Sequence, residues 1–399
     1  MMAMRMRLMA LSAMVLVSAC GHVTNAAQGA DYRLYEAAAR PDSPIVAIID
    51  IKSRAAHDQL PLGTPSPDWK HYYTVRGGSL FDTDPATGAT SIRVGLPADY
   101  RLPPATSTGI PGGLSQDGRW LVLQRFDGAV SHFLVFDTTS LVLRRSIDLA
   151  GYFQFDAVSN DGDRLFLIQY VNTTDYHVRS YSVSGGALDP NFIVDKNDGA
   201  AAMNGLKLTG IASRDGTWLF SVYARGHAGA FIHALYLGGG FAFCLDLPGN
   251  GFDDGDQSSL DWSLSLSPDG THLYATNPAL GVVTEILAGG PSVGRTVHIA
   301  EPSHVWPAGS VVSADSKTLV IAGATGVVWL DTATLTQRHH ALDSWTVRSL
   351  ALSPDGATLY VVNDAGAIAE VSMANGSVST TFDPNIAHPI ALMRVEGVA

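Results

Sequence analysis

The stretch Ser353-Pro354-Asp355-Gly356-Ala357-Thr358-Leu359-Tyr360-Val361-Val362-Asn363 decides the fold, because the chain repeats it. The same pattern returns as Ser267-Pro268-Asp269-Gly270-Thr271-His272-Leu273-Tyr274-Ala275-Thr276-Asn277. Weaker copies begin at five further serines: Ser66, Ser115, Ser159, Ser213 and Ser313. The spacing between successive anchors runs from 40 residues (313 to 353) to 54 residues (159 to 213). Seven anchors in one register indicate a repeat architecture.

The local chemistry of the pattern predicts one blade of a β-propeller per copy. Asp-Gly supplies a tight turn, since Asp bonds nearby backbone and Gly accepts a positive φ. A β-branched and aromatic run follows, such as 359–362, and a third strand ends in an acid, as in 327–331. Four antiparallel strands per unit of this length are typical of a propeller blade. Two anchors carry Trp69 and Ser316 in place of Gly, which leaves the turn type there open.

The two ends of the chain hold strands that lack partners of their own. Residues 45–50 have the pattern of a third strand, and residues 388–393 that of a first strand. Pairing the two ends would remove the exposed edges that an open sheet must otherwise protect. We therefore predict one all-β domain over residues 41–399, a propeller of four-stranded antiparallel sheets closed by its N- and C-terminal strands. We expect seven blades, with the terminal strands added to existing ones; eight are possible.

Two of the repeats resemble a known family. Tyr274-Ala275-Thr276-Asn277 and Tyr360-Val361-Val362-Asn363 resemble the Tyr-Val-Thr-Asn signature of YVTN-type β-propellers, which are relatives of the WD-repeat and lactonase-like propellers. The resemblance covers roughly residues 45 to 396. It implies the architecture and leaves the activity open, because one fold hosts many functions.

The first residues have the pattern of a secretory signal. Arg5 and Arg7 precede an uncharged apolar run over 8–19 that is short for a membrane span. Val17-Ser18-Ala19-Cys20 resembles a bacterial lipobox, which implies cleavage after residue 19 and a lipid on Cys20. The alternative is an ordinary secretory signal with a coincidental cysteine. We expect a signal peptide over 1–19, a lipidated tether over 20–40, and a protein anchored on the extracytoplasmic face of a bacterial envelope.

Composition and missing motifs exclude several functions. The chain has 25 Lys+Arg against 37 Asp+Glu, a net charge of −12, which argues against a nucleic-acid partner. Two cysteines cannot make a disulfide framework, and no zinc or c-type haem motif is present. An acidic loop with Asp253, Asp254 and Asp256 is a weak Ca²⁺ candidate that lacks the EF-hand spacing, so a solvated turn is favoured. We expect no other cofactor.

The topology predicts where a binding site would lie. The turn joins the first strand to the second, so the ends of the second strands meet at the opposite face. The residue eight positions after each Asp marks that face: Arg76, Arg125, Gln169, Tyr223, Asn277, Gly323 and Asn363. Entrances to first strands add Phe153, Trp262, Trp306 and Trp345. These residues would either form a binding mouth or, for the aromatics, wedge between blades as core, with the asparagines capping strands.

Three functions stay open. The leading hypothesis is a lipid-anchored binding or scaffold module for a protein, peptide or glycan partner, without catalysis. The alternative is a lactonase-like hydrolase or lyase, by analogy with the resembling propellers, for which Arg76, Arg125 and Glu301 are the charged candidates. A weaker third is an accessory subunit of an envelope redox complex that carries no cofactor itself.

Overall fold

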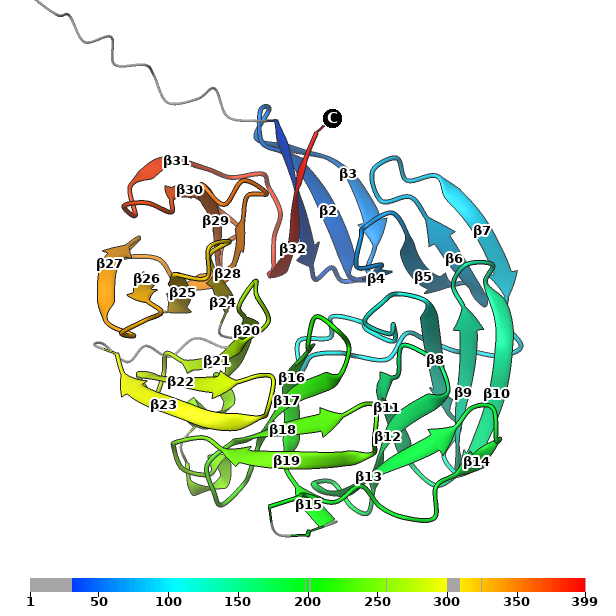
Figure 1. The fold of residues 1–399 in the computed structure, drawn as a ribbon. Coiled ribbons are helices and arrows are strands. Elements are labelled where there is room, and N and C mark those ends of the chain that lie inside the picture. Colours follow the sequence, from blue (N-terminus) through cyan, green and yellow to red (C-terminus); the bar gives the residue numbers. More distant parts are fainter. Residues whose placement is uncertain are drawn as a thin grey trace, which may run out of the picture.

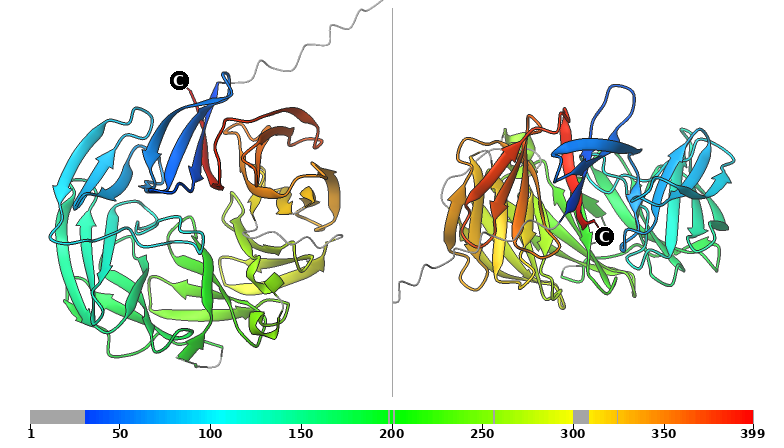
Figure 2. Two further views of the ribbon diagram at one scale, coloured as in Figure 1. Left: turned by 180° about the vertical axis from the view of Figure 1, so that it is seen from behind. Right: turned by 90° about the horizontal axis from the view of Figure 1, so that it is seen from above.

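The computed structural model describes residues 31–398 except 198, 201, 256, 300–308 and 324. Within this range the chain forms eight antiparallel sheets arranged as a ring (Figure 1). Seen from behind and from the edge, the ring is a disc whose blades stand side by side around a centre (Figure 2). None of the helices in the described residues is long and apolar enough to cross a bilayer.

The strands of each blade follow from the innermost outward. Blade 1 contains β32 (Pro389–Gly397), β1 (Tyr32–Ala38), β2 (Ile45–Asp50) and β3 (Ala55–Pro61). Blade 2 contains β4 (Thr64–Pro65), β5 (Tyr72–Arg76), β6 (Ser79–Thr83) and β7 (Thr90–Gly95). Blade 3 contains β8 (Trp120–Phe126), β9 (Val130–Asp137) and β10 (Val142–Ala150). Blade 4 contains β11 (Phe153–Val158), β12 (Arg164–Tyr170), β13 (Asp175–Ser182) and β14 (Ala187–Leu188), with β15 (Ala202–Asn204) paired to β13.

The remaining blades are regular. Blade 5 contains β16 (Leu206–Ala212), β17 (Trp218–Ala224), β18 (Phe231–Tyr236) and β19 (Phe241–Asp246). Two 3-10 turns, η1 (Phe252–Asp254) and η2 (Gln257–Leu260), lead to blade 6, which contains β20 (Ser263–Leu266), β21 (His272–Asn277), β22 (Val282–Leu287) and β23 (Ser292–His298). Blade 7 contains β24 (Ser310–Val312), β25 (Thr318–Gly323), β26 (Gly326–Asp331) and β27 (Gln337–Ala341). Blade 8 contains β28 (Val347–Leu352), β29 (Thr358–Asn363), β30 (Ile368–Ser372) and β31 (Val378–Phe382).

The expectation of seven blades is wrong, because the two chain ends build a complete eighth blade. β32 pairs with β1, which pairs with β2, so the predicted closure of the ring by terminal strands is confirmed. The strand that the sequence analysis did not predict is β1, which lies inside the range 20–40 expected to be a tether. The propeller therefore begins at Tyr32, and the segment between Cys20 and the fold is shorter than predicted.

Blade 1 buries an acid at the closure. Glu36 in β1 is fully buried, and neither of its carboxylate oxygens has a hydrogen-bond partner. It lies where the register between β1 and β32 shifts, next to Tyr35. Burial, and after it the charge of Asp383, raises the pKa of Glu36 to about 8. The closing blade thus carries a buried group whose protonation depends on pH.

The seven anchors fold into one hydrogen-bonded turn. In every copy the Ser hydroxyl donates to the Asp carboxylate at 2.5 to 2.7 Å. The same Ser oxygen accepts the backbone N–H five residues later, at 2.9 to 3.1 Å. These bonds satisfy buried groups between the first and second strands. The anchors are therefore turn residues, as their repetition predicts.

The two anchors without glycine keep the same turn. Trp69 and Ser316 adopt φ of 58° and 61°, in the left-handed region that the anchor glycines occupy. A side chain there costs free energy, since only Gly adopts this region without a steric penalty. Trp69 gains packing in return, because its ring lies 5.0 Å from that of Tyr35 and 5.2 Å from the guanidinium carbon of Arg394. No comparable contact offsets Ser316.

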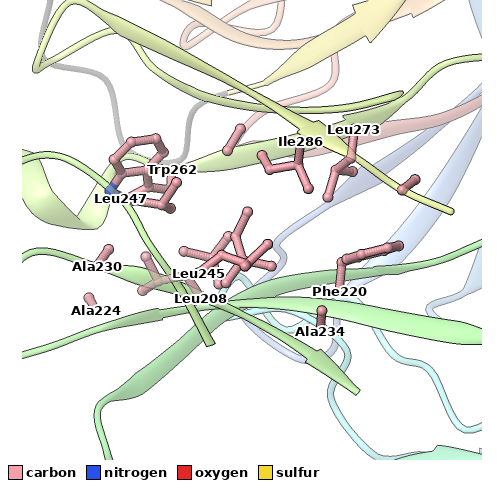
Figure 3. Close-up of a cluster of buried hydrophobic side chains, with 14 of the residues drawn as sticks. Leu208, Phe220, Ala224, Ala230, Ala234, Leu245, Leu247, Trp262, Leu273 and Ile286 are labelled. Atoms are coloured by element: carbon pink, nitrogen blue, oxygen red, sulfur yellow. The ribbon is translucent and has the colours of Figure 1, made fainter. Parts of the chain in front are cut away.

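The core is divided among the blade interfaces. Eight hydrophobic clusters lie one at each contact between neighbouring blades. The largest joins blades 5 and 6, where Phe220 and Leu208 of one blade face Leu273 and Ile286 of the next (Figure 3). Each sheet thus buries both faces against its neighbours, as a propeller requires.

Blade 3 departs from the repeat at its inner edge. In place of a first strand it has two isolated bridges, Arg101 to Gln124 and Leu114 to Leu121. Between them residues 102–113 fold back on themselves, with Pro104 paired to Pro111. The tip of this inner hairpin reaches blade 5, where the Ser107 N–H donates to the Leu208 carbonyl at 2.8 Å. The inner hairpin therefore bridges blade 3 and blade 5 on the inside of the ring.

Candidate functional site

The structure brings the predicted ends of the second strands together at the face opposite the turns. The seven positions eight residues after each anchor Asp lie at or next to the last residue of the second strand in their blades, as in β5, β17 and β29. They therefore share the face opposite the turns, in agreement with the topological argument. Their side chains do not form one mouth, because each meets different neighbours.

Three of the predicted aromatics belong to the core. Phe153, Tyr223 and Trp262 are 4%, 1% and 3% exposed. Trp262 packs with Leu247 in the cluster between blades 5 and 6 (Figure 3). These positions fit the interpretation of aromatics wedged between blades, and their buried faces offer no surface to a partner.

The two asparagines cap strand ends. The Asn277 amide donates to the Ser258 carbonyl at 2.7 Å and its oxygen accepts the Leu280 N–H at 2.9 Å. Asn363 accepts two backbone N–H groups of its own turn, from Ala365 and Ala367. Both side chains satisfy backbone groups, as the capping alternative predicts.

The two arginines lie apart, each on an aromatic ring. The guanidinium of Arg76 lies 4.5 Å from the centre of the Phe81 ring. That of Arg125 lies 5.8 Å from the Tyr100 ring, and its Nη2 is 3.7 Å from the Asp127 carboxylate. In the part of the chain that the structure describes, these two arginines do not converge on a shared pocket.

The other predicted residues divide between exposed positions and the undescribed part. Trp345 is partly exposed and packs against the cluster between blades 7 and 8. Asp253 is exposed, with an oxygen 3.9 Å from His227 Nε2, and no group of three metal-ligating side chains occurs among the described residues. Four predicted positions lie outside the described residues: Cys20, Asp256, Glu301 and Trp306. The side chain of Asp254 lies outside them too.

A row of six aromatic rings runs along the predicted face from blade 3 to blade 5. Successive ring centres are 4.8, 5.3, 6.2, 5.1 and 5.5 Å apart. Aromatic pairs at these distances attract each other beyond the burial of their area. The members of this aromatic row, in order, are Phe126, Tyr152, Tyr170, Tyr176, Tyr223 and Phe231.

The aromatic row is open to solvent at one end. Phe126 and Tyr152 are 40% and 38% exposed, whereas Tyr176 and Tyr223 are buried. Val171 is 64% exposed. It directly follows Tyr170, whose N–H donates to the Tyr152 carbonyl. We call Phe126, Tyr152 and Val171 the platform. Large apolar side chains grouped on a surface mark sites of interaction.

Polar groups flank the platform on both sides. Next to Phe126, the His132 ring bridges Asp127 at 2.8 Å and Asp148 at 2.6 Å. Burial lowers the pKa of His132, but these two hydrogen bonds outweigh it and raise that pKa above its ordinary value. The bond with His132, and then backbone N–H groups, lowers the pKa of Asp127 to about 2. Beyond Val171, Asp175 accepts hydrogen bonds from the amides of Asn172 and Asn204.

Tyr170, Tyr176 and Tyr223 of the aromatic row stay uncharged over the physiological pH range. Burial, and then the neighbouring Tyr152 and Asp156, raise the pKa of Tyr170 to about 12. The pKa values of Tyr176 and Tyr223 lie well above the ordinary value, again through burial first. The exposed end presents large apolar side chains with a charged rim, which is the arrangement of a protein-binding hot spot.

Sequence reasoning identified Tyr223 of this row and missed its exposed end. Phe126 directly follows the predicted Arg125, and Tyr152 directly precedes the predicted Phe153. The signal in the sequence was an aromatic residue at the end of the second strand of blade 3, and another just before the first strand of blade 4. That signal becomes specific only when the blade order places the two ends side by side.

No protein-family model and no curated protein matches the sequence. Similar solved structures include the dihydro-heme d1 dehydrogenase NirN in complex with DHE, at 15% identity and a TM-score of 0.58, covering 92% of this chain and 75% of that one. Apo AztD from Citrobacter koseri is 11% identical with a TM-score of 0.58, covering 93% and 100%. A periplasmic gluconolactonase, PpgL from Pseudomonas aeruginosa, is 17% identical with a TM-score of 0.47, covering 93% and 99%. At these identities the likeness to NirN and AztD establishes the fold alone.

Proposed function

We propose that this chain is a lipid-anchored, extracytoplasmic propeller that binds a partner protein at the platform and catalyses no reaction itself. The observation that carries the proposal is the platform: three exposed apolar side chains at the open end of a rigid aromatic row. Tyr and Phe supply much contact area with few rotatable bonds, so little conformational entropy is lost when a partner covers them. Val171 extends the surface with an aliphatic group, which favours apolar side chains of a protein over a sugar ring.

The fold also supports an orientation of the platform relative to the membrane. β1 is the second strand of its blade, so its first residue lies at the face of the turns. Tyr32 lies there, next to the turn of blade 8: burial, and then a hydrogen bond with Asp355, raises its pKa. A chain from Cys20 to Tyr32 spans at most about 40 Å when fully extended. A lipid on Cys20 would therefore hold the face of the turns toward the bilayer and present the platform outward.

Anchoring is tested with the two cysteines of the chain. Cys20→Ala removes the residue that would be acylated, so the protein should leave the membrane fraction. Cys244→Ala is the matched control, since Cys244 lies in β19 of the folded domain and should leave membrane association unchanged. Fractionation followed by mass spectrometry of the mature N-terminus is the measurement. Retention of the Cys20→Ala protein in the membrane would contradict the anchor.

Partner binding is tested by placing a photo-crosslinking amino acid, benzoylphenylalanine, at position 152 in living cells. We expect one defined protein to be captured there, and capture to be lost when Phe126→Ala is added. The matched control is position 142, which is 59% exposed on the outer strand of blade 3 and should capture nothing specific. With the captured partner purified, Phe126→Ala should weaken binding by about 1–3 kcal/mol. Equal capture at 142 and 152, or none at 152, would rule the platform out.

A further inference from the structure

A second, separate site lies in the centre of the ring. The inner edges of blades 2 to 5 and the inner hairpin line an open cavity of about 460 Å³. This volume lies in the range of small-molecule sites. Its wall includes Thr64 of blade 2, Pro104 and Gly112 of the inner hairpin, Phe155 and Asp156 of blade 4, and Lys207 of blade 5.

The inner hairpin is fixed on both sides of this cavity. Besides the bond from Ser107 to blade 5, the Thr64 hydroxyl donates to the Gly112 carbonyl at 2.8 Å. Gly113, with φ of 104°, lies so close to the Val122 carbonyl that a Cβ would stand 2.6 Å from it. The hairpin therefore forms a rigid wall, and the cavity is preformed.

One ion pair supplies the charge of this cavity. Lys207 Nζ lies 2.5 Å from Asp156 Oδ1. The Asp156 side chain is fully buried, whereas that of Lys207 is 20% exposed. Among the described residues that line the cavity, these two are the charged ones. The pair is therefore a dipole whose positive end faces the cavity and whose negative end lies in the wall.

This arrangement selects the charge of a ligand. An ammonium group has three N–H donors, and one of them is used by Asp156. The other two can be donated to an acceptor on a ligand, and for a ligand beside Lys207 the nearer cation outweighs the more distant carboxylate because Coulomb energy falls with separation. Pro65, Pro104 and Phe155 make much of the wall apolar. The carboxylate of a ligand can therefore contact Lys207 while the hydrocarbon body of the same ligand packs against this wall.

We infer that the central cavity binds a small organic monocarboxylate with an apolar body, held by Lys207. Asp156 positions the Lys207 ammonium and does not touch the ligand. This site uses no residue of the platform, so it holds or fails independently of the proposed partner binding.

The test is calorimetric titration of the mature protein with three probes of one shape: cyclohexanecarboxylate, cyclohexanecarboxamide and cyclohexylmethylamine. We expect the carboxylate to bind at least about tenfold more tightly than the amide, and the amine not to bind. Equal affinity for carboxylate and amide, or no heat from the carboxylate at millimolar concentration, overturns the assignment.

Variants separate the ligand contact from a structural effect. Lys207→Met should weaken carboxylate binding at least about tenfold. Gln116→Trp places a larger side chain in the cavity wall and should weaken binding, so the site stays testable if Lys207→Met does not fold. Asp156→Asn should tighten carboxylate binding, since it removes the opposing charge; weakening would contradict the dipole. Lys196→Met, at a lysine that stacks on Phe241, is the control and should bind as the unmodified protein does.

Discussion

Blade 8 and blade 1 stand side by side but are held together by different means. In blade 8 the turn at Ser353 joins the first strand to the second within a few residues, and its polar groups are satisfied locally. Blade 1 has no such turn, because its first strand comes from the other end of the chain. There the Tyr35 hydroxyl bonds Glu396, 361 residues away, and Glu36 is buried without a partner. Local repetition thus stabilises seven blades, and long-range burial closes the eighth.

The largest expected difference between the two blades is their response to pH. The pKa of Glu36 in the folded chain is about 8, above its ordinary 4.5. Because the folded chain holds the Glu36 proton more tightly than the unfolded chain does, the contribution of protonated Glu36 to the free energy of unfolding is fully present below pH 4.5. It is lost as pH rises through 8. Over that window the free energy of unfolding should fall by up to about 5 kcal/mol. Chemical denaturation from pH 5 to pH 9 measures the fall, and Glu36→Gln should remove most of it.

A carboxyl in blade 8 provides the control for that experiment. Burial raises the pKa of Glu370 in β30 as well, but the charge of Arg54 opposes the shift. Glu370→Gln should therefore leave most of the pH dependence in place. If both variants respond alike, the effect does not belong to the closure.

A smaller loss is expected from the turn of blade 8. Ser353→Ala removes the acceptor of the Thr358 N–H and the donor to Asp355, in a buried setting. We expect a cost of about 1–2 kcal/mol, measured by urea denaturation. Ser267→Ala should cost the same within about 0.5 kcal/mol, because its turn has the same geometry. The exposed Ser377 is the control; a cost for Ser377→Ala equal to that for Ser353→Ala would mean that the turn network adds nothing specific.

The smallest expected change is a gain in blade 7. Ser316→Gly relieves a left-handed φ of 61° at a position with no compensating contact. The gain should be about 0.5–1 kcal/mol, since Gly also loses more entropy on folding. A rise in thermal midpoint measures it. Trp69→Gly should instead destabilise, because the Trp69 ring packs on Tyr35; a gain there would show that this packing contributes little.

The repeated turns could be predicted because their bonds form within a few residues of sequence. The pairing of residues 45–50 and 388–393 followed from their strand patterns. β1 was missed because both faces of this strand are buried, Glu36 included, so its residues show no apolar–polar alternation. That missing strand changed seven blades to eight.

The candidate site was less predictable, because its members come from different blades. The end of the second strand and the entrance to the next blade were correctly assigned to one face. The predicted Arg125 and Phe153 are therefore sequence neighbours of the platform residues Phe126 and Tyr152. Phe126 and Tyr152 come into contact only when blade 3 packs against blade 4. The spacing of the repeats does not show this contact. The proline- and glycine-rich residues 102–113 indicate a loop but not that its tip reaches Leu208.

The placement of β32 has a consequence for how the molecule comes into being. Its nine residues, Pro389–Gly397, are made more than 350 residues after β1, yet they form the inner edge of the blade that contains β1. Until they arrive, β1 presents bare amides and carbonyls, an edge on which another nascent copy can pair. We therefore expect ring completion to be slow and sensitive to protein concentration, and a chain that lacks β32 to be prone to aggregation.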